Sequence, residues 1–459
     1  MNAITSIANF IATSSVPEAA LVPARNAFVD TIGVTLAGAV EPAARIVQKL
    51  AVSERSAHHC PILGTELRTS ATWASLANGT AAHALDFDDM CFVSLAHPSA
   101  PLVTAAIAVA EELGASGRAM LEAYVLGFEV EAVLGRVMNP RHYQQGWHCT
   151  STLGSIGAAA ACARLLRLDT VATANCIALA ASQASGLKEN FGTMSKPLHA
   201  GLAARNGVLA AKLAQNGFTA SERALDGPQG FLLAMASERN NLPETCASLG
   251  KRWEILETGI TVKLYPSCAA THPALDAVLD LRRENQLTAE NVQAVEVEVD
   301  SVTPNLLIYA QPKTGLEGKF SMNFCVAAAL SEGRVGLKTF EDDYVCSSHI
   351  QELLPRIIMR MNPNLGKNVP ALTQAIVTIR LANGETLRRE ANGARGYPER
   401  PPSAEELGTK FRSCALKALP EEMVESVLAC LHGLENLGDV QTLTAQLMVE
   451  KSVAADHQS

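Results

Sequence analysis

Long stretches of small and apolar residues dominate the first 215 positions of the chain. Residues 28–38, 71–82 and 102–110 carry at most one charged side chain in each run. Segments of this composition normally form helices that are buried on most sides. Abundant Ala and only 5% aromatic residues indicate helices packed closely through small side chains. The pattern predicts a helical region that extends to about residue 258.

The pattern changes near residue 258. Residues 292–300 alternate apolar and acidic side chains, as a half-exposed strand does. Residues 357–361, 375–381 and 386–390 are predicted to be further strands, and Asn383-Gly384 is a hairpin signal between the last two. From about residue 403 the pattern is helical again. We therefore predict a mainly α fold, with a helical domain at 1–258, a smaller α+β domain with an antiparallel sheet at 259–394, and a return to the helical domain at 395–459.

Composition excludes several classes of function. The net charge of −9 and the pI near 5.7 argue against binding to nucleic acid or to an anionic membrane. Eleven Cys without a Cys-x-x-Cys pair argue against a disulfide framework, a zinc ribbon or an iron–sulfur cluster. No apolar run reaches the ~20 residues that span a bilayer, and the N-terminus lacks the basic start of a secretory signal. We expect a cytoplasmic protein, and the low charged fraction of 18% favours an oligomer.

Residues 83–101 concentrate acid and base groups between two uncharged segments. His83, Asp86, Asp88, Asp89 and His97 lie within fifteen positions. Such groups are costly to bury unless they are paired or used, and their pKa values shift when they are buried. One alternative is that the Asp residues cap a helix. Another is a metal site, but no spacing matches a known signature, so we predict none.

Three further patches place basic groups among small residues. They lie at His148, at Lys196 with His199, and between Lys263 and His272. Taken alone, each has a structural interpretation, such as a core histidine, a solvated lysine or a helix cap. Taken together, the cations suit a substrate with several carboxylates, and neutral bases could remove a proton beside a carboxylate. A pyridoxal phosphate lysine is a further alternative, but no phosphate loop supports it.

The four patches, in this order, resemble the MmgE/PrpD family, whose activities include 2-methylcitrate dehydratase, cis-aconitate decarboxylase and iminodisuccinate epimerase. The matching strings are residues 83–89 with 97–99, 146–148, 193–201, 263–268 and 318–322. The resemblance covers residues 5–440. It implies a large all-helical domain built from both ends of the chain, with a smaller α+β lid of chorismate-mutase-like topology inserted and the active site at their junction. It also implies a homodimer and no metal or organic cofactor.

The resemblance also assigns site residues position by position. The family's active-site positions correspond to Asp86, His97, His148, Lys196 and Lys263. We add a second set of candidates for substrate binding, which are Asp89, Tyr143, His199, Tyr265 and His272.

Two positions depart from the decarboxylase branch of the resemblance. That branch has Tyr where this chain has Phe324, and Thr where it has Met90. Residues 190–199 are closer to the epimerase-like branch. We therefore predict an enzyme that removes a proton next to a carboxylate of a small polycarboxylate, with epimerisation of an iminodisuccinate-like substrate as the main hypothesis. The alternatives are a dehydratase or decarboxylase of 2-methylcitrate-like or cis-aconitate-like tricarboxylates, and a protein that binds a polycarboxylate without catalysis.

Overall fold

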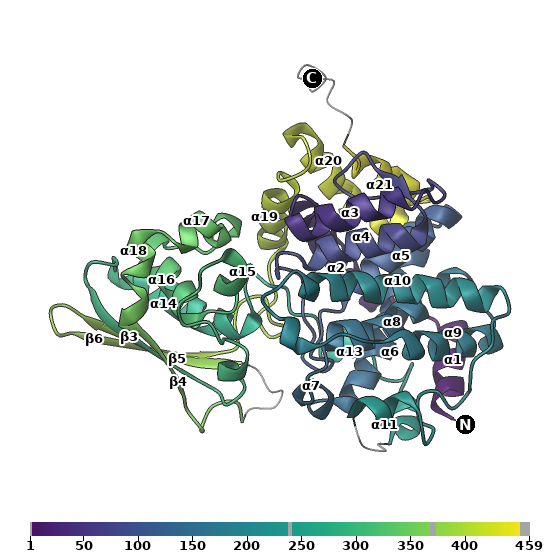
Figure 1. Cartoon of the computed structure of the whole chain (residues 1–459), viewed down its shortest axis with the longest axis horizontal. Helices are drawn as coiled ribbons and strands as arrows, with labels where there is room; N and C mark the ends of the chain where they lie inside the picture. Colours follow the sequence, from purple (N-terminus) through teal and green to yellow (C-terminus); the bar gives the residue numbers. More distant parts are fainter. Residues whose placement is uncertain (1, 237–240, 368–372, 450–459) are drawn as a thin grey trace. The chain divides into compact units, whose positions relative to one another are not determined.

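The fold is mainly α with a small α+β region, as the sequence predicts. The structure is a computed structural model that describes residues 2–236, 241–367 and 373–449 (Figure 1). The chain divides into two compact units. The larger unit comprises Met1–Ala84, Asp88–Thr261 and Ser403–Ser459, and the smaller one comprises Leu85–Phe87 and Val262–Pro402.

Helices from both ends of the chain build the larger unit. The N-terminal part supplies α1 (Ala3–Thr13), α2 (Leu21–Gly38), α3 (Pro42–Ser53), α4 (Ala71–His83), α5 (Ser99–Leu113), α6 (Gly117–Met138), α8 (Cys149–Leu165), α9 (Thr170–Gln183) and α10 (Ser195–Gln215). The C-terminal part supplies α19 (Ala404–Ala415), α20 (Glu421–His432) and α21 (Gln441–Gln446). Helix α10 packs against α4 and α8, and α19 packs against α2, so the C-terminal segment completes the helical core.

Helix α2 shows how completely these helices are buried. Its residues from Ala27 to Gly38 are all buried, and its one acid, Asp30, lies 2.6 Å from Lys410 Nζ of α19.

Among the described residues no single helix is long and apolar enough to cross a membrane, although the bent pair Glu18–Gly38 and Pro42–Ser53 meets the length and composition criteria together.

Glycine allows α4 and α10 to approach backbone to backbone. A Cβ on Gly79 would lie 2.8 Å from Gly201 Cα. A Cβ on Gly201 would lie 2.4 Å from the Leu76 carbonyl oxygen. The small residues that dominate the sequence are therefore required by the packing distance between helices, and not only by helix propensity.

The smaller unit is built on a four-stranded sheet in the order β4-β3-β5-β6. Its strands are β3 (Val292–Val299), β4 (Ile357–Met361), β5 (Gln374–Leu381) and β6 (Thr386–Asn392). Helices α14 (His272–Asn285) and α16 (Met322–Glu332) pack with it in one apolar core. The prediction of an antiparallel sheet is wrong for one pair, because β4 runs parallel to β3. The connection between them contains α16 and is long enough for a crossover, which parallel pairing requires.

The contact between α4 and α10 gives a first prediction. Gly201→Ala should lower the free energy of unfolding by about 1–3 kcal/mol, because the added methyl group overlaps backbone that cannot move alone. Urea unfolding measures this change. Gly408→Ala is the matched control, since a Cβ there would lie close to the end of the flexible Arg412 side chain and in ordinary contact with Leu428, with no backbone in the way. Equal stability of the two variants would contradict the close packing of α4 and α10.

Candidate active site

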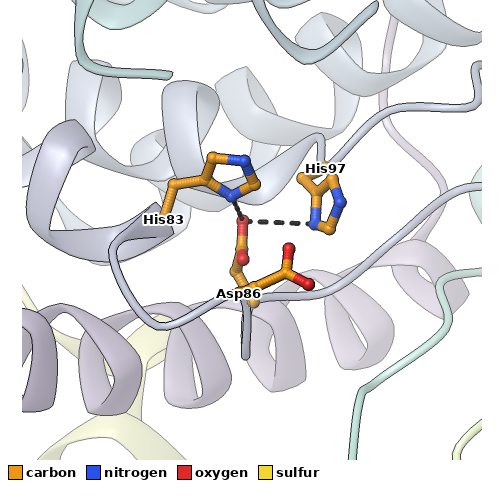
Figure 2. Close-up of side chains that lie close together, drawn as sticks. His83, Asp86 and His97 are labelled. Carbon is orange, nitrogen blue, oxygen red and sulfur yellow. Dashed lines mark hydrogen bonds and ion pairs between the residues drawn. The ribbon is translucent and has the colours of Figure 1, made fainter. Parts of the chain in front are cut away.

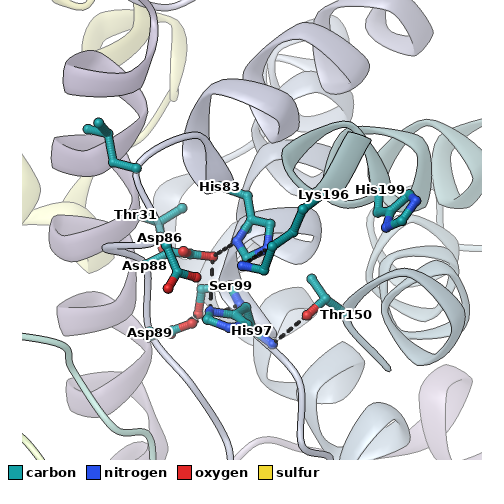
Figure 3. Close-up of polar contacts among 12 residues, drawn as sticks. Thr31, His83, Asp86, Asp88, Asp89, His97, Ser99, Thr150, Lys196 and His199 are labelled. Atoms are coloured by element: carbon teal, nitrogen blue, oxygen red, sulfur yellow. Dashed lines mark hydrogen bonds and ion pairs between the residues drawn. The ribbon is translucent and has the colours of Figure 1, made fainter. Parts of the chain in front are cut away.

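A carboxylate, an imidazole and an ammonium group form a buried line in the larger unit. His83 ends α4, and its Nδ1 lies 2.7 Å from Oδ2 of Asp88 in the following loop. Its Nε2 lies 3.0 Å from Nζ of Lys196, at the start of α10 (Figure 3). Burial lowers the pKa of His83 to about 3, although Asp88 opposes this effect, so the ring is neutral. A carboxylate only accepts and an ammonium only donates, so His83 carries its proton on Nδ1.

His97 shares the same carboxylate oxygen. Its Nδ1 lies 3.4 Å from Asp88 Oδ2 (Figure 3). Its ring meets that of His83 edge-on, with the ring centres 4.6 Å apart (Figure 2). Burial would raise the pKa of Asp88, but the two imidazoles together hold it well below its usual range. The His97 side chain is 13% exposed, whereas those of His83 and Asp88 are fully buried. His97 is therefore the member of this group that solvent reaches, and Thr150 Oγ1 fixes its backbone by accepting from its N–H at 3.0 Å.

A second pair of imidazoles lies beside this line. His148 directly precedes α8, and its Nδ1 is 3.1 Å from Nδ1 of His199 in α10. The His148 ring stacks near His83 at 5.6 Å and meets the edge of Phe191 at 4.9 Å. Burial holds the pKa of His148 well below its usual range and lowers that of His199 to about 4. Both rings are therefore neutral near pH 7.

The donor set fits hydrogen bonding better than a metal ion. His83, Asp88 and His97 each place a possible ligand atom within 4.8 Å of the others. A cation bound there would displace the 2.7 Å contact between His83 and Asp88, and it would lie beside the positive charge of Lys196. The Lys196 ammonium already takes up the His83 Nε2 lone pair that a metal ion would otherwise bind.

In the smaller unit, two lysines hold the turn that contains Asp86. Lys263 Nζ lies 3.1 Å from Asp86 Oδ2 and donates to the Asp86 carbonyl oxygen at 2.9 Å. Lys319 Nζ donates to the carbonyl oxygens of Leu85 and Pro266 at 2.7 and 2.9 Å. Asp86 has a φ of 51°, in the left-handed region that few residues other than glycine adopt. The two ammonium groups thus stabilise a strained turn, and the catalytic role of Lys263 and Asp86 stays a prediction.

Two candidates for substrate binding are engaged within the smaller unit. The Tyr265 hydroxyl donates to Asp276 Oδ1 at 2.6 Å and accepts from Arg395 at 2.7 Å. His272 is buried, with Nε2 3.1 Å from the Ser267 carbonyl oxygen, and burial lowers its pKa to about 3. Their part in substrate binding stays a prediction.

The other two candidates, Asp89 and Tyr143, lie in the larger unit. Both carboxylate oxygens of Asp89 bond to Ser99, one through its backbone N–H at 3.2 Å and one through a short bond to its hydroxyl. Asp89 thus caps the start of α5, which is the alternative that the sequence left open. The Tyr143 ring lies 3.6 Å below Lys188 Nζ.

The predicted catalytic set omits His83 and Asp88, although both belong to the charged stretch. The sequence feature that could have identified them is the position of His83 at the end of an uncharged helix. A buried imidazole there needs a hydrogen-bond partner, and the loop that follows contains Asp88. Phe191 and Lys319 were missed as well. Both stand in or beside strings that carry the family resemblance, but an aromatic ring and a single lysine have no signal of their own.

The burial of Asp89 generates a prediction about stability and pH. Burial raises its pKa to about 8, with Asp30 and Asp88 adding to the effect. The folded protein therefore holds a proton that the unfolded chain releases near pH 4, so stability should fall as the pH rises from about 4 to 8. Asp89→Asn removes this contribution, and its stability relative to the natural protein should improve by on the order of 1–3 kcal/mol between pH 5 and 8.

Urea midpoints at pH 5, 6.5 and 8 measure this difference. Glu129 and Glu131 have pKa values raised to about 7 and 8 by burial, so the slope of Asp89→Asn should be reduced and not abolished. The exposed Glu405→Gln serves as the control for loss of one acid. Parallel profiles for the natural protein and Asp89→Asn would contradict the prediction.

Comparison with known proteins places this geometry in a family. The model of the MmgE/PrpD N-terminal domain matches residues 2–243, and that of the C-terminal domain matches residues 265–433. Cis-aconitate decarboxylase of Mus musculus is 29% identical over 399 residues, which cover 83% of this chain and 79% of that protein. The enzyme of Homo sapiens is 28% identical, with 83% and 80% covered, and that of Aspergillus terreus is 24% identical, with 95% and 93% covered. The chain belongs to the MmgE/PrpD family.

Proposed function

We propose that the protein is a lyase that decarboxylates a small tricarboxylate of the cis-aconitate type by acid/base chemistry. The observation that carries the proposal is a buried cluster in which one ionised carboxylate contacts two imidazoles, one of which meets an ammonium group. The similarity to three cis-aconitate decarboxylases supports a lyase. The relatives compared above include no epimerase, so the main hypothesis from the sequence gives way to its alternative.

The cluster offers what the reaction needs. Loss of CO₂ breaks a carbon–carbon bond, and its electron pair forms a new double bond while the former alkene carbon takes up a proton. A cation must hold the carboxylates, and an acid must deliver that proton. We assign the cation role to Lys196. We assign the proton to His97, because its ring is reachable and the ionised Asp88 beside it stabilises the imidazolium form.

The neutral imidazoles of His148 and His199 could bind substrate through hydrogen bonds without adding charge to the site. Two imidazoles joined through Nδ1 retain donors or acceptors at their Nε2 atoms, which can bond carboxylate oxygens without adding charge. Lys263 remains the second proposed cation on the strength of the family resemblance.

Dehydration is the second candidate, and two residues favour it. Phe324, where the resemblance expects Tyr, is fully buried in α16 with its ring 5.5 Å from that of Phe340. Met90, where it expects Thr, likewise offers no hydroxyl. On a 2-methylcitrate-like substrate the same cluster would remove the proton beside a carboxylate and protonate the departing hydroxyl.

Proton NMR in deuterated water tests the proposal. Purified protein is incubated separately with cis-aconitate, 2-methylcitrate and iminodisuccinate. We expect itaconate from cis-aconitate, with one deuterium at the carbon that took up the proton. Water loss from 2-methylcitrate would support the second candidate, and interconversion of iminodisuccinate stereoisomers would restore the epimerase hypothesis. Binding without change in any tube would support a non-catalytic protein.

Substitution of His97 tests its assigned role. His97→Asn should lower kcat by about 10²–10⁴-fold, because the proton donor is removed while most contacts of the loop remain. The matched control is His58→Asn, since His58 is exposed and bonds to the Arg68 carbonyl oxygen. The rate of product formation at saturating substrate gives kcat for both variants. Full activity of His97→Asn would remove His97 from the mechanism.

A further inference from the structure

We propose that Asp88 and His83 are positioning residues that set the tautomer of His97 and the orientation of Lys196. This inference rests on the proposed function and deepens it. Neither residue belongs to the set that the family resemblance assigns, and both side chains are fully buried. They act through the two groups to which the reaction is assigned.

One oxygen of Asp88 controls both histidines. Oδ2 lies 2.7 Å from Nδ1 of His83 and 3.4 Å from Nδ1 of His97. An ionised carboxylate can only accept, so His83 must present an N–H at Nδ1. For His97, an N–H at Nδ1 is the form that makes its 3.4 Å contact with the same oxygen favourable. This leaves the Nε2 atom of each ring on the side away from Asp88. For His97, that atom is then the one placed to exchange a proton with a substrate carbon.

His83 passes the same constraint on to Lys196. With its proton on Nδ1, His83 offers an Nε2 lone pair to the Lys196 ammonium at 3.0 Å. The Phe191 ring, whose centre is 5.4 Å from the same Nζ, bounds the ammonium on another side. A long lysine side chain loses considerable freedom when it is held in this way, so a substrate carboxylate meets a cation that is already oriented.

Stability alone does not account for this arrangement. The other oxygen of Asp88, Oδ1, is buried and has no hydrogen-bond partner among the described residues. A buried carboxylate with an unsatisfied oxygen costs free energy, and well-packed apolar residues would generally stabilise the core better. The carboxylate is thus placed to serve the imidazoles, at the expense of its own hydrogen bonding.

The test replaces the carboxylate by its amide. Asp88→Asn should lower kcat by at least about 100-fold while the protein stays folded, because a carboxamide can donate and no longer fixes the tautomer of either ring. The matched control is Asp300→Asn. Asp300 is also buried and accepts from the N–H groups of Val302 and Thr303, and Asn can replace it as a cap. The control should keep its kcat within about threefold of the natural protein.

Nitrogen-15 NMR of labelled histidine supplies a readout that loss of stability would not move. In the natural protein, His83 and His97 should both carry the proton on Nδ1, and in Asp88→Asn at least one of them should shift to Nε2. In the natural protein, a His83 or His97 ring that is protonated on Nε2 and not on Nδ1 would overturn the inference. A folded Asp88→Asn variant with unchanged kcat would overturn it as well. The tautomer measurement needs no turnover, so it judges the inference even if no tricarboxylate is converted.

A second variant keeps the test decisive if Asp88→Asn does not fold. His83→Asn retains a donor toward Asp88 but removes the acceptor for Lys196. It should lower kcat by at least about 10-fold and leave His97 protonated on Nδ1. An active natural enzyme with an equally active His83→Asn would overturn the role of His83 and leave the proposed function intact.

Discussion

The hydrogen bond between the Asp88 carboxylate and the His83 ring is the interaction on which the site depends. It fixes one proton at Nδ1 and thereby determines what His83 offers to Lys196. The same carboxylate oxygen also meets His97, so a single negative charge organises a cation and a proton donor. Without that charge, the imidazolium form of His97 would have no counterion beside it.

The helical packing brings this interaction about. His83 ends α4 and Lys196 begins α10, and the two helices touch at Gly79 and Gly201, about one turn away from those residues. A backbone-to-backbone contact sets the distance between the helices with little freedom. The small residues that fill the sequence therefore have a functional consequence, because they place an ammonium within hydrogen-bond distance of an imidazole.

Much of this organisation could be predicted from the sequence. Uncharged helices, the strands from residue 292 onward and the concentration of acids and bases at 83–97 follow from residue spacing and composition. The parallel pairing of β3 with β4 could not be predicted, because it depends on where a long connection returns the chain. Nor could the choice among Asp86, Asp88 and Asp89. All three are acids in one short stretch, yet one joins Lys263, one joins two histidines and one caps α5.

The proposed mechanism requires that the cluster around Asp88 receive the carboxylates of the substrate. A crystal structure of His97→Asn with bound cis-aconitate tests it most directly. We expect a carboxylate oxygen within hydrogen-bond distance of Lys196 Nζ and an alkene carbon facing residue 97. A tricarboxylate bound only elsewhere, for example in the cavity of about 860 Å³ lined by Arg164 and Arg167, would contradict it.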